Sequence, residues 1–228
     1  MKLEDFGPFK LSVGKHKGPE EGMCVMEMVS FLAGDEWSDM PQCACPILSG
    51  FCQRINDRFG QEQRDELQTL VPMLIGTRSP EHEKARADIL AWGAVRKFAP
   101  FYFRKAGLIE WADRLAGFQG SLRDARGLLL EARKAADAYA AAYAYAAADA
   151  AAAAAADADA ADAYAAAAYA AAAAAADAAA DAADAAAAEV FPVVMEVLRE
   201  AIAAGPRGEA YSEIHMRRGA DLRQLLSA

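Results

Sequence analysis

The residues best suited to chemistry lie in one apolar helix and in the segments on either side of it. Residues 22–34 contain a single charged side chain, Glu27, among neighbours that are apolar nearly all round the helix. An ionised carboxylate in such surroundings needs a partner. Two interpretations stay open: Glu27 pins the loop that follows it through a buried salt bridge or hydrogen bond, or it acts in a site as an acid, a base or a ligand contact.

The loop 34–46 and a short basic turn before the helix supply the other candidates. Trp37 either covers the core or stacks on a planar ligand or a partner. Ser38 and Asp39 are good turn residues, so a local capping role is the alternative to ligand binding. The turn 15–18 contains two Lys and one His and suits a phosphate. The predicted ligand-binding set is therefore Lys15, His16, Glu27, Trp37, Ser38, Asp39 and Cys43.

Cysteine spacing argues against a metal centre. The four cysteines fall within 29 residues, but no two of them form a Cys-x2-Cys pair, and His16 is the only imidazole nearby. We expect reduced thiols packed as small hydrophobic groups, with no metal and no cofactor. The chain also lacks the phosphate-binding glycine loops, the HExxH motif and the nucleophile elbow. No residue is therefore assigned as catalytic, and the four cysteines are Cys24, Cys43, Cys45 and Cys52.

Six basic residues outside this region have no motif around them. We expect a solvated face from them rather than a ligand clamp; they are Arg54, Arg58, Arg96, Lys97, Arg104 and Lys105.

The elements that must position these residues are helical, because no segment shows sustained period-two alternation. Gly34 is expected to end the first helix, and Pro46 to open the second. Pro72 is expected to kink the third helix, and Pro100 to end the fourth. Ser121 and Asp124 fit a capping box before a long helical run. Pro192 is expected to kink or restart the helix at Phe191. The predicted helices span residues 20–33, 47–59, 61–75, 79–98 and 108–118, the run from 121, and 193–203.

The fold prediction is all-α: a compact N-terminal helical bundle followed by a long alanine-rich helix or helical hairpin. The predicted boundaries are an N-terminal domain at 1–120, an alanine-rich helix or hairpin with a terminal amphipathic helix at 121–204, and a short tail at 205–228.

An alanine tract dominates the second half of the chain. Residues 135–188 comprise 41 Ala, eight Asp and five Tyr, which favours a helix of about 80 Å if unbroken. Most of the Asp residues fall within about 100° of arc, and the opposite face is smooth. We expect that face to pack on protein, either through a hairpin near 157–162 or against a second copy; a lone solvated helix is the alternative. The predicted oligomer anchors are Tyr139, Tyr143 and Tyr164.

Charge narrows the classes of partner. Residues 1–134 carry 19 basic and 19 acidic side chains, and the tract adds eight Asp without a base. Such a surface repels duplex nucleic acid and anionic membrane. Residues 1–10 lack the apolar core of a signal peptide, and the tract is too often interrupted by Asp to span a bilayer. We expect a cytoplasmic, homo-oligomeric protein.

One motif carries a resemblance. The segments Gly22-Met-Cys-Val-Met-Glu27, Gly34-Asp-Glu-Trp-Ser-Asp39-Met-Pro41-Gln-Cys43-Ala-Cys-Pro46, Ile55-Asn-Asp57 and Gly76-Thr77 resemble a group of uncharacterised proteins of actinobacteria and their phages. Many members of that group also end in an alanine-rich helix. The resemblance implies a phage or mobile-element accessory protein and carries no established activity.

Three functions remain open at this stage. The first is a non-enzymatic, self-associating helical binding protein, for example a phage anti-defence factor that sequesters a host protein or a nucleotide signal. A nucleotide would require Arg or Lys side chains and an aromatic ring that converge, and we expect them at a subunit interface. The second is a small enzyme that uses Glu27, Asp39 and a loop Cys, which requires these groups to share a pocket. The third is a structural spacer or scaffold.

Overall fold

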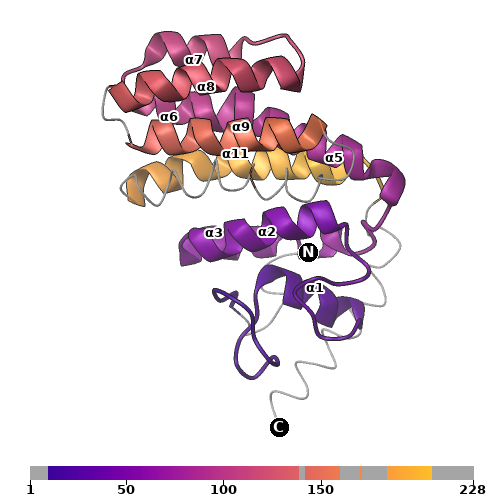
Figure 1. Ribbon diagram of the computed structural model, residues 1–228. Helices are drawn as coiled ribbons and strands as arrows, with labels where there is room; N and C mark the ends of the chain where they lie inside the picture. Colours follow the sequence, from indigo (N-terminus) through magenta and orange to yellow (C-terminus); the bar gives the residue numbers. More distant parts are fainter. Residues whose placement is uncertain (1–9, 139–141, 160–169, 171–183, 207–228) are drawn as a thin grey trace. The chain divides into compact units, whose positions relative to one another are not determined.

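The computed structural model describes residues 10–138, 142–159, 170 and 184–206. In this part of the chain the regular structure is helical, apart from one isolated parallel bridge between Leu11 and Met23 (Figure 1). The predicted all-α class is therefore confirmed. The chain divides into two compact units: unit 1 comprises residues 1–80 and 205–228, and unit 2 comprises residues 81–204. The predicted domain boundary at residue 120 falls inside unit 2.

Unit 1 is built around a short buried helix. Helix α1 (Val25–Ala33) packs against α2 (Pro46–Arg58), α3 (Gln61–Gln68) and α4 (Val71–Leu74). Gly34 ends α1 with a left-handed backbone (φ 73°), as its position in the sequence predicts.

Two prolines explain the start of the second predicted helix and the break in the third. Pro46 opens α2 in its first turn, where no N–H is needed. The single helix expected over 61–75 is instead two, α3 and α4, with Thr69 and Leu70 between them. Pro72 cannot donate to the carbonyl of Gln68 and crowds it, so the helix breaks rather than kinks.

An extended arm precedes α1. Beside the bridge to Met23, the backbone N–H of Ser12 donates to the Met23 carbonyl at 2.9 Å. The arm, the turn that follows it and the N-terminus of α1 are thereby held together.

Unit 2 is organised on one long helix. Helix α5 (Pro80–Gly93) continues through a π-helical turn, η2 (Ala94–Phe98), into α6 (Ala99–Lys105). The expectation that Pro100 ends the helix near residue 98 is wrong. The N–H of Ala99 donates to the carbonyl of Ala94, five residues back, and this wider turn relieves the clash of the Pro100 ring with the carbonyl four residues before it.

Two further helices follow the long one. They are α7 (Ile109–Ala116), within the segment predicted as helical, and α8 (Leu122–Ala138). The predicted capping box is confirmed: Ser121 Oγ lies 2.6 Å from Asp124 Oδ2, and the N–H of Asp124 donates to Ser121 Oγ at 3.2 Å.

The alanine tract does not form one unbroken helix. Helix α8 ends at Ala138, and α9 (Ala142–Asp159) packs along it, so the two form an antiparallel pair joined by an ion pair between Arg133 and Asp149. The chain therefore reverses well before residues 157–162, of which 160–162 lie outside the described residues. Poly-alanine has no turn signal, so burial of the smooth face decides the position of the reversal. That face is buried in α9 at Ala144, Ala147, Ala148, Ala151, Ala152, Ala154 and Ala155.

Helix α11 (Asp184–Ala203) closes unit 2, and Pro192 lies inside it. The expected restart at Phe191 is wrong, since the helix is continuous. Pro192 leaves the carbonyl of Ala188 without a helical donor, and Ala188 is exposed. A proline inside a helix costs about 3 kcal/mol. Burial of apolar side chains on the same helix offsets this cost; they are Phe191, Val194, Met195 and Leu198.

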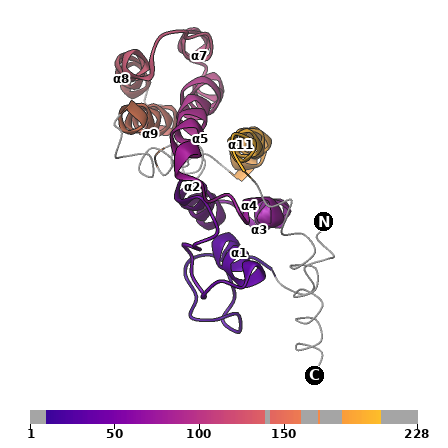
Figure 2. The same ribbon diagram turned by 90° about the vertical axis from the view of Figure 1, so that its right-hand side faces the viewer.

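The long helix lies between two others. Figure 2 shows α9 and α11 on opposite sides of α5 and its continuation, and η2 contacts both. Among the described residues, no helix combines the length and the apolar character that crossing a bilayer requires.

Candidate functional site

Glu27 anchors the candidate site in unit 1 from the first turn of α1. The side chain is fully buried. Its Oε2 accepts the backbone N–H of Cys24 at 2.8 Å, and Cys24 Sγ accepts the backbone N–H of Glu27 at 3.4 Å. This reciprocal pair is a capping box. The helix dipole favours a negative charge at the same position.

His16 is bound to the same carboxylate at two points. Its backbone N–H donates to Glu27 Oε1 at 2.7 Å, and its Nδ1 lies 2.8 Å from Glu27 Oε2. Trp37 fixes the carbonyl group of His16, because its Nε1 donates to the carbonyl oxygen at 2.8 Å. Glu27 therefore pins the turn that precedes α1, and not the loop that follows it.

A serine that the sequence analysis missed completes this network. Ser12 Oγ lies 3.0 Å from His16 Nε2 and accepts the backbone N–H of Met23 at 3.1 Å. The Met23 carbonyl, 3.4 Å from Ser12 Oγ, is a second and more distant acceptor for the hydroxyl proton. Hydroxyl, imidazole and carboxylate are thus joined in a chain, which is the arrangement that activates a hydroxyl by general-base chemistry. Neither composition nor spacing in the sequence marks Ser12, because the arm reaches His16 only through the bridge to Met23.

Lys15 and Asp39 join the basic turn to the loop after α1. Lys15 Nζ lies 3.0 Å from Asp39 Oδ1, and this hydrogen bond raises the pKa of Lys15. Ser38 has a local role: its N–H donates to Ser30 Oγ at 3.2 Å, and its own Oγ accepts the N–H of Met40 at 3.0 Å. The turn and the loop are therefore fixed relative to each other.

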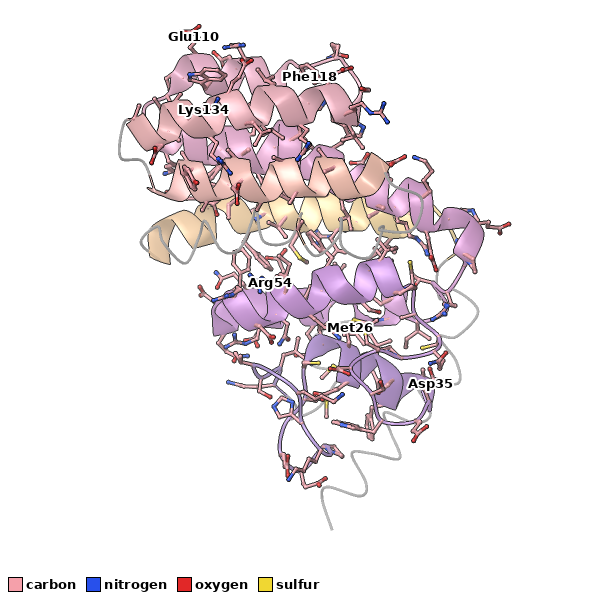
Figure 3. All side chains as sticks on the ribbon, viewed as in Figure 1. Met26, Asp35, Arg54, Glu110, Phe118 and Lys134 are labelled. Atoms are coloured by element: carbon pink, nitrogen blue, oxygen red, sulfur yellow. The ribbon has the colours of Figure 1, made fainter. Side chains whose placement is uncertain are left out.

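Cys43 lies in the same loop but is not an activated nucleophile. Its backbone N–H donates to Asp35 Oδ2 at 3.0 Å; Asp35 is labelled in the loop after α1 in Figure 3, with Met26 on the helix itself. Burial, with a smaller effect of Asp35, raises the pKa of the Cys43 thiol to about 12. A raised pKa makes this thiol a poor nucleophile, which argues against Cys43 as the loop cysteine of the enzyme hypothesis. In the described part of the chain, no group of three or more His, Cys, Asp or Glu side chains is placed to hold a metal ion.

Two polar residues of α2 form hydrogen bonds with the arm and with α1. Asn56 Nδ2 donates to the Ser12 carbonyl at 2.8 Å, and Asn56 Oδ1 accepts the N–H of Val25 at 3.1 Å. Asp57 accepts the N–H of Gly14 at 2.9 Å. The Ile55-Asn-Asp57 segment of the motif quoted in the sequence analysis was the signal available for these roles.

A second candidate site lies in unit 2, between the long helix and α11. A groove of about 540 Å³ follows η2 and α6 on one side and α11 on the other. Four of the basic residues expected to form a solvated face line this groove, and three of them are 34–47 % exposed. The full lining is Arg96, Lys97, Phe101, Arg104, Lys105, Val193 and Glu196.

Three of these cations have exposed carboxylate partners at the edge of the groove. The nitrogen–oxygen distances are 3.0 Å for Lys97 and Glu196, 2.7 Å for Arg104 and Asp113, and 2.5 Å for Lys105 and Glu189. Exposed pairs of this kind contribute about 0–1 kcal/mol. They leave the cations available to a stronger anion.

Arg96 differs from the other three. Its guanidinium carbon lies 3.7 Å from the centre of the Trp92 ring, and its Nε donates to the Phe118 carbonyl at 3.0 Å. No carboxylate among the described residues lies within ion-pair distance of it. Arg96 also borders a smaller hollow of about 260 Å³ beside Trp92 and Gly93. The ring and the carbonyl fix this cation without neutralising it.

The predicted oligomer anchors are not placed by the structure. Tyr139 and Tyr164 lie outside the described residues, and so does the side chain of Tyr143, whose backbone belongs to α9. The described Ala face of α9 is covered by α8, η2 and α6 of the same chain.

Comparison with known proteins adds no assignment to either site. No family model, no curated protein and no solved structure matches this chain. The functional conclusion therefore rests on the geometry of the network in unit 1 and of the groove in unit 2.

Proposed function

We propose that the chain is a helical binding protein whose groove in unit 2 holds a phosphate-bearing ligand of the nucleotide type. The observation that carries this proposal is the convergence of four cations and one aromatic ring, Phe101, on a single groove. Convergence of these residue types is the requirement that a nucleotide imposes. Here it occurs within one chain rather than at a subunit interface.

Electrostatics supports a phosphate as the recognised group. Arg96 is held in place by Trp92 and Phe118, and an arginine fixed in this way binds phosphate oxygens in a bidentate manner at little entropic cost. Lys97, Arg104 and Lys105 can exchange exposed carboxylates for a phosphate that carries more charge. Ligand binding is then expected to weaken as salt rises.

The aromatic ring favours a nucleotide over inorganic phosphate. Phe101 is half-buried in the groove lining, with Lys105 Nζ 5.8 Å from its ring centre. A planar base stacked on an exposed ring gains about 1–3 kcal/mol. In this proposal the groove binds and retains the ligand. Retention suits sequestration of a nucleotide signal, the role that a phage anti-defence factor would have.

Isothermal titration calorimetry tests this proposal with ATP, tripolyphosphate and adenosine as probes. We expect ATP to bind most tightly, tripolyphosphate more weakly and adenosine weakest. Arg96→Gln and Phe101→Ala should each weaken ATP binding about tenfold, which corresponds to about 1.4 kcal/mol. Arg126→Gln is the matched control, because Arg126 is exposed on α8 and does not line the groove. Absence of ATP binding, or equal losses in Arg96→Gln and Arg126→Gln, would overturn the proposal.

Self-association belongs to the same proposal but rests on the tract beyond α9. The smooth face of α9 is already covered within the chain, so a second copy would have to pack on other residues of the tract. Light scattering at several concentrations measures this directly. A stable dimer or larger assembly supports self-association, and a monomer at every concentration excludes it.

A further inference from the structure

The network in unit 1 contains the three groups of a nucleophilic triad in the right order. Ser12 Oγ lies 3.0 Å from His16 Nε2, and His16 Nδ1 lies 2.8 Å from Glu27 Oε2. Both distances fall within the range in which a base accepts the proton of a nucleophile and is in turn oriented by a carboxylate. The groups come from the arm, the turn and α1, so the fold of unit 1 brings them together.

The surrounding contacts fix which nitrogen carries the proton. Glu27 accepts the backbone N–H groups of His16 and Cys24 on its two oxygens, so the carboxylate acts as an acceptor and Nδ1 as the donor. With Nδ1 directed at Glu27, Nε2 is the ring nitrogen that faces the Ser12 hydroxyl. Trp37 holds the His16 carbonyl at 2.8 Å, which limits rotation of the turn.

Gly22 keeps one side of the reacting pair free of side-chain atoms. Its backbone is left-handed (φ +117°), and a Cβ built on it would lie 2.6 Å from Ser12 Oγ and 3.2 Å from His16 Nε2. Any residue other than glycine would therefore fill the space over both atoms. Ser12 itself is only partly buried, and the side chain of His16 is 11 % exposed.

We propose that Ser12 is a nucleophile for acyl transfer, with a small carboxylic ester as the acyl donor. Ser12 Oγ attacks the ester carbonyl while its proton passes to His16 Nε2. The carbon–oxygen bond to the alcohol then breaks, the alcohol leaves with that proton, and the acyl group stays on Ser12 as an ester. Water, deprotonated by His16 in the same way, releases the acid and restores the hydroxyl. The Met23 N–H donates to Ser12 Oγ at 3.1 Å and so stabilises the negative charge that develops on this oxygen as the proton leaves.

This activity is independent of the groove in unit 2, since it uses residues of unit 1 alone. Glu27 acts as a positioning residue, because it touches only His16 and the backbone around it. The enzyme hypothesis drawn from the sequence keeps Glu27 but replaces Asp39 and the loop Cys with His16 and Ser12.

A fluorophosphonate probe and p-nitrophenyl acetate test the proposal on the full-length chain. The probe forms a phosphorus–oxygen bond with an activated serine and releases fluoride, and mass spectrometry of a digest locates the adduct. We expect a single adduct on Ser12 and turnover of the ester. Ser12→Ala should abolish labelling, and His16→Gln should slow it at least a hundredfold. Ser38→Ala is the matched control, because Ser38 is a hydroxyl of the neighbouring loop that does not contact His16.

Circular dichroism separates a catalytic role from a structural one. Ser12→Ala and His16→Gln should keep the helical signal of the wild-type chain while labelling is lost or slowed. Gly22→Ala provides a second check, since it keeps Ser12 and His16 but places a methyl group against both, and it should also reduce labelling. A wild-type chain that is not labelled, an adduct at any other residue, or full labelling of Ser12 in His16→Gln would each overturn the proposal.

Discussion

Gly93 of α5 lies directly against Val197 of α11. A Cβ built on Gly93 would stand 2.6 Å from Val197 Cγ1 and 3.1 Å from Val197 Cγ2. The two helices approach this closely because position 93 has no side chain. The contact borders the hollow beside Trp92 and sets the distance between the long helix and α11, which form the two sides of the proposed nucleotide groove.

Gly93→Ala is expected to lower the free energy of unfolding by about 1–3 kcal/mol, since the added methyl group overpacks a helix crossing. Gly127→Ala is the matched control: Gly127 lies within α8, and a Cβ there meets no atom within 4 Å. That substitution should stabilise the protein by about 0.5–1 kcal/mol through helix propensity. Urea denaturation measures both. A neutral or stabilising Gly93→Ala would contradict the close contact.

The two faces of α9 give a second matched pair. Ala151 is fully buried, and Ala153 is exposed two residues later. Ala151→Leu should destabilise the protein by about 1–3 kcal/mol, because the larger side chain forces α9 away from its neighbours. Ala153→Leu should change stability by less than about 0.5 kcal/mol. Equal effects in thermal unfolding would mean that the alanine face does not pack in solution.

Much of the fold could be predicted because helix ends carry local chemistry. Gly34, Pro46 and the Ser121–Asp124 box each act within one turn of the chain, and the structure confirms all three. The errors came where packing outweighs local preference. Pro100 and Pro192 lie inside continuous helices, and the tract reverses between α8 and α9 without a Gly or Pro to mark the turn.

The candidate site was only partly predictable for the same reason. Glu27 and Trp37 stand out in the sequence because a charged or large aromatic residue is unusual in its surroundings. The chain then brings His16 to both of them. Ser12 could not be found, since its contact with His16 depends on pairing of the arm with Met23. The sequence predicts a solvated face for the cations of the groove and cannot predict their convergence, because that convergence depends on how α11 packs on η2.

Glu27→Gln is expected to destabilise the protein by about 2–3 kcal/mol. Three N–H donors point at the carboxylate, and an amide offers them one oxygen and one competing donor group, which leaves buried donors without acceptors. Glu21→Gln is the control: Glu21 is exposed and accepts only the Lys17 N–H, at 3.1 Å, so its loss should cost less than about 0.5 kcal/mol. Chemical denaturation distinguishes the two. A Glu27→Gln variant as stable as the wild type would show that the carboxylate is not needed to hold the turn.

Cys24 predicts a dependence of stability on alkaline pH. Burial raises the pKa of its thiol from 9.0 to about 12, so the folded chain keeps the proton after the unfolded chain has lost it. Below pH 9 the thiol has no effect, and above it stability falls, by about 1.4 kcal/mol at pH 10 from this group alone.

Cys24→Ser isolates this contribution. The hydroxyl can still accept the Glu27 N–H and is a preferred N-cap, but it does not titrate. The difference in unfolding free energy between the variant and the wild type should therefore grow from pH 8 to pH 10. A difference that stays constant with pH would place the Cys24 thiol in contact with solvent.

The nucleotide groove is tested most directly by amide chemical shifts during an ATP titration of the ¹⁵N-labelled chain. We expect saturable shifts concentrated on η2, α6 and the facing part of α11, around Arg96, Phe101 and Glu196, and little change in unit 1. No saturable shifts, or shifts confined to residues outside this groove, would contradict the assignment of a phosphate-bearing ligand to it.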